Sequence, residues 1–162
     1  MTNAAFPKAE TIEASLELLA ELCDDPTPHI YQELFRVHPY MESYFWRDTD
    51  GAIKGEMLSR TFEAILDFIG PRRYAAMMIG TEMVTHEGYD VPREVFITFF
   101  VVIRDVMQTI IGDAWEPDID EAWQELLRDI QYFADITPRS DPNSAHSREV
   151  HARLEAAGMK TR

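Results

Sequence analysis

The chain has 162 residues, which is enough for one domain with a sizeable core and too few for two. Its 15 lysine and arginine residues against 29 aspartate and glutamate residues give a net charge of −14, which disfavours a nucleic-acid partner. The chain has one cysteine, a start unlike a signal peptide, and a longest apolar run, at 95–103, too short for a membrane span. Together these features predict a soluble cytoplasmic protein with no membrane partner.

Prolines divide the sequence into segments of helical length, and within these segments apolar residues recur every three or four positions. In chain order, the clearest segments are 12–23, 30–34, 58–69, 96–110 and 119–133. Thr27-Pro28 is typical of a helix start and Gly112 of a helix end. No strand alternation competes, so we predict an all-α fold of about seven helices over residues 1–136. The polar tail at 137–162 is expected to form a short helix or to stay disordered.

His86 stands out in the segment 83–92, MVTHEGYDVP, because it lies one turn before a glycine, a valine and a proline that end a helix. A histidine in such a place can be a packed core residue, a surface residue or a metal ligand, and the first two are the more common. The other four histidines show no spacing that would bring several of them onto one ion.

His86 belongs to a set of segments with a recognisable order. They are LFRVHPYMESYF at 34–45, THEGYDVP at 85–92, and GDAW at 112–115 followed by EAW at 121–123. In order and spacing they resemble the globin family, in particular the bacterial single-domain (3-on-3) globins and the haem domain of flavohaemoglobins. The resemblance covers residues 10–136 and implies a globin-like fold of about seven helices around a haem pocket.

The resemblance also implies a role for several residues. His86 is expected to be the proximal ligand of the iron in haem b, and the only metal ligand that the protein supplies. Phe45 is expected to pack against the haem face, Tyr31 to occupy the distal pocket position, and Arg47 to reach a haem propionate.

The next helix follows a loop of variable length, so its apolar positions set its register. That register puts Thr61 at the distal position, with Arg60 there if the helix shifts by one residue. It also puts Ile65 beside the space over the iron. The residues expected to line the proximal side are Val91, Phe96 and Phe99.

Two features of the proximal side are left open. The second ring nitrogen of His86 needs an acceptor, which Thr85 or a carbonyl of the preceding turn could provide. The residue four before the ligand is usually apolar in globins, but here it is Glu82. Either the helix turns so that Met83 covers the haem, which is our preferred interpretation, or the carboxylate lies near the proximal side and favours ferric iron.

The resemblance implies reversible binding of a diatomic gas, oxygen and also nitric oxide, at a five-coordinate iron, for storage or transport. No catalytic residue is expected in the chain. Two alternatives stay open: a haem-based gas sensor that signals to a partner protein, and a nitric oxide dioxygenase that depends on a separate reductase. A globin-like module without haem is disfavoured, because His86 and Phe45 are both present.

Overall fold

The computed structural model describes residues 6–71, 74–139 and 152. This part of the chain contains six α-helices, two 3-10 helices and no strand. The bounds are α1 Ala9–Leu22, α2 Thr27–Val37, η1 Pro39–Phe45, α3 Ala52–Ile69, α4 Ala75–Gly88, α5 Arg93–Ile111, η2 Gly112–Ala114 and α6 Pro117–Ile136. The prediction of an all-α fold is confirmed. The prediction for the tail at 137–162 falls, from residue 140 on and apart from residue 152, outside the described residues.

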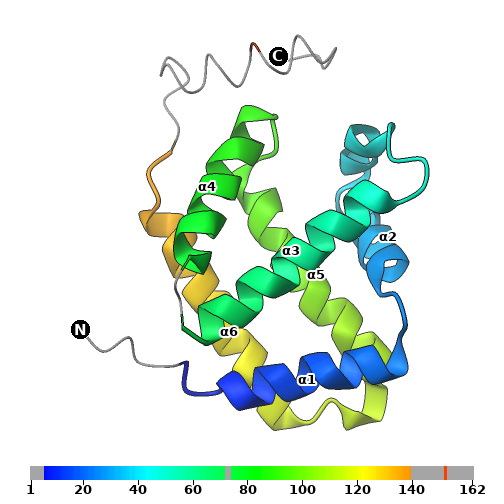
Figure 1. Cartoon of the computed structure of the whole chain (residues 1–162), viewed down its shortest axis with the longest axis vertical. Helices are drawn as coiled ribbons and strands as arrows, with labels where there is room; N and C mark the ends of the chain where they lie inside the picture. The colour runs from blue at the N-terminus through cyan, green and yellow to red at the C-terminus, as the bar shows by residue number, and fades with distance from the viewer. Residues whose placement is uncertain (1–5, 72–73, 140–151, 153–162) are drawn as a thin grey trace.

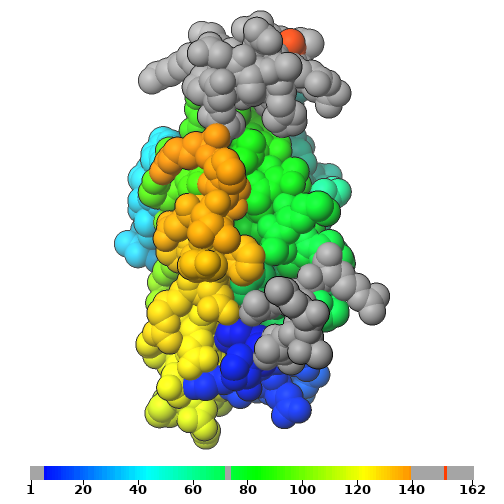
Figure 2. Space-filling model, turned by 90° about the vertical axis from the view of Figure 1, so that its left-hand side faces the viewer, coloured from blue at the N-terminus to red at the C-terminus, as the bar shows by residue number. Residues whose placement is uncertain are grey.

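Helix α5 is the central element of the packing, because it contacts α1, α2, α4 and α6, whereas α3 packs against α2 and α4. In Figure 1, α1 crosses the lower end of the molecule, α2 lies at the right and α4 at the upper left. Figure 2 shows α6 on the surface beside α4 above and α1 below. By length and composition alone α5 could cross a membrane, but a core helix of a soluble bundle meets the same criteria.

The core between α1 and α6 holds a polar pair among apolar side chains. Trp123 of α6 and Ser15 of α1 are both fully buried. The Ser15 hydroxyl donates to the carbonyl oxygen of Ile12 at 2.7 Å and accepts the indole N–H of Trp123 at 3.0 Å. Both polar side chains are therefore satisfied, and the second bond fixes α1 against α6.

The helix start predicted at Thr27-Pro28 is the start of α2. Thr27 is already the first helical residue, and its backbone N–H donates to Oδ1 of Asp25 at 3.0 Å. Hydrogen bonds from the side chain and the backbone of Thr27 lower the pKa of the Asp25 carboxyl. Pro28 lies in the first turn, as predicted, because its missing N–H would have no partner there anyway.

Asp48 fixes the start of α3 after the loop that follows η1. Its buried carboxylate accepts the backbone N–H groups of Ile53 and Lys54, each at 3.0 Å, and pairs with the Lys54 ammonium at 3.0 Å. Burial acts to raise the pKa of the Asp48 carboxyl, but these bonds outweigh it and hold the pKa below its usual value. The first turn of α3 therefore has a charged anchor.

Asp67, near the end of α3, anchors the start of α4 in the same way. Its buried carboxylate accepts the backbone N–H groups of Tyr74 at 3.2 Å and Ala75 at 2.8 Å. We expect Asp67→Ala to lower the free energy of unfolding by about 1–3 kcal/mol, because a helix cap is lost and a buried N–H loses its acceptor. Urea unfolding followed by circular dichroism measures this change. Glu63→Ala, at an exposed position of the same helix, is the control, and an equal loss in both variants would contradict the anchoring role.

Candidate functional site

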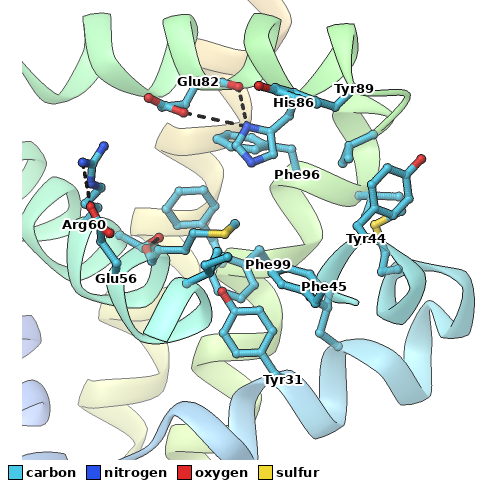
Figure 3. Close-up of a pocket in the computed structure, with 18 of the residues that line it drawn as sticks. Tyr31, Tyr44, Phe45, Glu56, Arg60, Glu82, His86, Tyr89, Phe96 and Phe99 are labelled. Atoms are coloured by element: carbon cyan, nitrogen blue, oxygen red, sulfur yellow. Dashed lines mark hydrogen bonds and ion pairs between the residues drawn. The ribbon is translucent and has the colours of Figure 1, made fainter. Parts of the chain in front are cut away.

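A cavity of about 510 Å³ lies between α3 and α4 and is closed by parts of α2, η1 and α5 (Figure 3). The volume lies in the range of cavities that hold cofactors and other small molecules. Its wall is mostly apolar, with a few polar groups that come from different helices. Of the residues predicted for a site, those that line this cavity are His86, Tyr31, Phe45, Arg47, Thr61, Val91, Phe96 and Phe99.

The last turn of α4 holds His86 in a defined orientation. Its Nδ1 lies 2.7 Å from the backbone carbonyl oxygen of Glu82. Because a carbonyl only accepts, Nδ1 carries the proton, and Nε2 of the neutral ring keeps its lone pair. The ring projects toward the interior of the cavity and contacts the ring of Phe96, with centroids 5.1 Å apart (Figure 3). The lone pair is therefore available to a metal ion or a polar ligand in the cavity.

The chain after His86 holds the end of α4 in place. The carbonyl oxygen of His86 accepts the backbone N–H groups of Tyr89 and Val91, each at 2.9 Å. Asp90 has a φ of 61°, in the left-handed region, which turns the chain sharply before Pro92 starts the approach to α5. The break that the sequence predicts at this point therefore fixes the backbone on both sides of the imidazole.

The acceptor for the His86 ring is the carbonyl of the preceding turn and not Thr85. The hydroxyl of Thr85 donates to the carbonyl oxygen of Thr81 at 2.9 Å, so it is used within the helix. The preferred interpretation, in which Met83 and not Glu82 faces the site, is wrong. Glu82 lines the cavity, whereas Met83 is fully buried in the core and does not line it.

Tyr31 faces the cavity from α2, on the side opposite His86 (Figure 3). Its ring packs among Phe35, Phe45 and Phe99, with centroid distances of 5.9, 5.3 and 5.5 Å. The hydroxyl is buried and has no hydrogen-bond partner among the described residues. Leaving such a group unsatisfied costs about 1–3 kcal/mol, so a ligand that accepts this bond would recover that energy.

The electrostatics of the pocket keep Tyr31 a donor. Burial, and to a smaller extent the carboxylate of Asp48, raise the pKa of the phenol above its usual value. Thr61 also lines the cavity, but its hydroxyl donates to the carbonyl oxygen of Met57 at 2.8 Å. Tyr31 is thus better placed than Thr61 to donate a hydrogen bond to a ligand.

The register of α3 differs from the prediction at one position. Ile53, Met57, Thr61 and Ala64 line the cavity at spacings of three and four, and Arg60 lies beside them. Ile65, which was expected on this wall, is fully buried in the core and does not line the cavity. Thr61, which the same register placed, does line the cavity, so the helix is not rotated as a whole and only Ile65 turns into the core. Met57 and Ala64 line the cavity without having been predicted.

Two arginines lie at the rim of the cavity. The guanidinium of Arg60 pairs with Glu56 at 2.8 Å, and both side chains are well exposed. The guanidinium of Arg47 lies 4.6 Å from the centre of the Trp46 ring. Arg60 is therefore already paired with a carboxylate of its own helix, and Asp48, Glu56 and Glu82 add negative charge to the lining.

Residues 6–71 and 74–139 contain no group of three or more His, Cys, Asp or Glu side chains that could hold a metal ion. A single imidazole holds a metal ion well only when a cofactor supplies most of the other ligands, as a porphyrin does. Comparisons with protein-family models, curated proteins and solved structures found no match.

Proposed function

We propose that this chain is a globin that holds haem b in the cavity between α3 and α4 and binds oxygen reversibly, with nitric oxide as a second ligand. One observation carries the proposal: an imidazole nitrogen and an unsatisfied phenol face the same apolar cavity from opposite sides (Figure 3). When bound through His86, the haem iron would supply a coordination position for a diatomic gas.

The helix packing supports a globin-like fold. Helix α3 packs against α2 and α4, and α5 packs against α1, α2, α4 and α6. The helix that carries the proposed ligand and the helix that carries the phenol are therefore on different sides of the cavity, with α3 between them.

The cavity residues fit the parts of a haem group. Phe45, Phe96 and Phe99 offer aromatic surface to the apolar macrocycle, and Val91 adds aliphatic surface. Arg47 and Arg60 lie at the rim, where the two propionates would need cationic partners. The carbonyl of Glu82 orients the His86 ring, as the hydrogen-bond partners of metal-bound histidines usually do.

The direct test of the proposed function is reversibility. The purified chain is loaded with hemin, reduced without oxygen, and then exposed to oxygen and to vacuum in turn while its visible spectrum is recorded. We expect the spectrum to change with oxygen and to return after its removal. A spectrum that moves irreversibly to the ferric form within the first exposure would contradict a carrier. Decay of nitric oxide in the presence of oxygen is then followed with and without a separate reductase. Decay that continues over many turnovers only with the reductase would identify a dioxygenase.

One contact favours the gas sensor as a second candidate. The buried guanidinium of Arg93 binds Glu87, next to His86, at 2.6 Å and donates to the carbonyl oxygens of Ala134 at 2.8 Å and Thr137 at 2.6 Å. The end of the ligand helix is thus linked to the end of α6. Hydrogen exchange at residues 134–139, measured on the haem-loaded protein with and without carbon monoxide, tests this. A change in exchange supports a sensor, and identical exchange contradicts it.

A further inference from the structure

Glu82 presents two oxygen atoms to the same nitrogen of His86. Its backbone carbonyl oxygen lies 2.7 Å from Nδ1, and its carboxylate oxygen Oε2 lies 3.9 Å from the same atom. Figure 3 shows both contacts on the α4 side of the cavity. The carbonyl fixes the orientation of the ring, so the carboxylate adds a negative charge beside a ring that is already positioned.

The charge of Glu82 is not neutralised by a neighbouring cation in the described structure. Among the described residues, His86 is the only basic residue whose side-chain nitrogen lies within 4 Å of the Glu82 carboxylate. The next carboxylate along the helix, Glu87, is instead paired with Arg93 at 2.6 Å. Glu82 is therefore the carboxylate of α4 whose charge acts on the imidazole.

A negative charge beside a ligand ring stabilises the more positive oxidation state of the metal that the ring holds. The carboxylate would act through space, as a charge 3.9 Å from Nδ1, because the hydrogen bond to that nitrogen is made by the backbone carbonyl. The Glu82 side chain is 46% exposed, so water and salt screen the effect and reduce its size.

We propose that the Glu82 carboxylate biases bound haem toward the ferric state. This inference rests on the proposed function. Reduction of bound haem would take one electron from an external reductant, and the Glu82 carboxylate would make and break no bond in it. Glu82 thereby sets how strongly reducing an electron donor must be to prepare the protein for gas binding.

The test is a reductive titration of the haem-loaded protein with dithionite and mediator dyes, followed by absorbance. We expect Glu82→Gln to raise the equilibrium constant for reduction by about three- to tenfold, and tenfold corresponds to about 59 mV for a one-electron couple. Glu82→Leu should give a similar shift, and Glu82→Asp should keep most of the wild-type value. Glu63→Gln, which removes an equal charge from an exposed position of α3, should have little effect.

Salt dependence separates an electrostatic role from a purely structural one. The difference between Glu82→Gln and the wild type should shrink as the salt concentration rises from about 0.01 to 1 M, because the Debye length falls from about 30 to 3 Å. Equal equilibrium constants in the haem-loaded wild type, Glu82→Gln and Glu82→Leu would overturn the inference and leave the proposed function standing. A wild type that takes up no hemin would overturn both.

Discussion

Replacement of His86 by glycine is expected to weaken hemin binding by at least about 100-fold and to remove the spectrum of histidine-ligated iron. The reason is that losing the ligand costs more than losing a partner of the ligand, which already costs about 10- to 100-fold. The variant leaves the cavity wall otherwise intact, so added imidazole should enter the vacated space and restore the ligated spectrum. Absorbance titration with hemin, with and without imidazole, measures both effects.

His29→Ala is the matched control for this substitution. His29 is exposed on α2 and does not line the cavity, so the variant should bind hemin as the wild type does. If His86→Gly kept the wild-type spectrum and affinity, His86 would not be the ligand. Loss of the ligated spectrum in His29→Ala would point to a surface histidine instead.

Tyr31→Phe is expected to speed the dissociation of oxygen from the reduced, haem-loaded protein by about five- to 150-fold. This range corresponds to the loss of about 1–3 kcal/mol from one hydrogen bond in a dry site. Stopped-flow mixing with a competing ligand measures the rate. The variant should not lower the free energy of unfolding, because the hydroxyl it removes is buried without a partner among the described residues.

The exposed Tyr132 provides the control for the tyrosine substitution. Its side chain is on the surface of α6, with the residue 61% exposed, so Tyr132→Phe should change neither dissociation nor stability. An unchanged dissociation rate in Tyr31→Phe would show that the phenol does not contact the ligand. A large loss of stability in the same variant would show that the hydroxyl has a structural partner.

The helices with strong apolar periodicity were predictable because their burial pattern is local. The segments 96–110 and 119–133 correspond to α5 and α6, whose buried side chains recur every three or four positions. Helix α4 was predicted only at its end. Its start depends on Asp67 of another helix, which accepts the N–H groups of Tyr74 and Ala75, and a local pattern cannot show such a bond.

His86 and Tyr31 were predictable because each lies close to a helix end that the sequence marks. His86 precedes a helix break and Tyr31 lies four residues after Thr27, where α2 begins, and both line the cavity. Thr61 also lines the cavity, whereas Ile65, one turn further along α3, lies in the core, because an apolar position on a helix can face either. The choice between Glu82 and Met83 has the same origin, because one step along a helix turns a side chain by about 100°.

Hemin titration of the purified wild-type chain is the most direct test of the central claim that the cavity holds haem through His86. We predict uptake of one hemin per chain, with a sharp Soret band that saturates at that ratio and is absent at equal concentration in His86→Gly without imidazole. A wild-type titration that gives only the broad band of free hemin, with no saturation at one equivalent, would contradict the account.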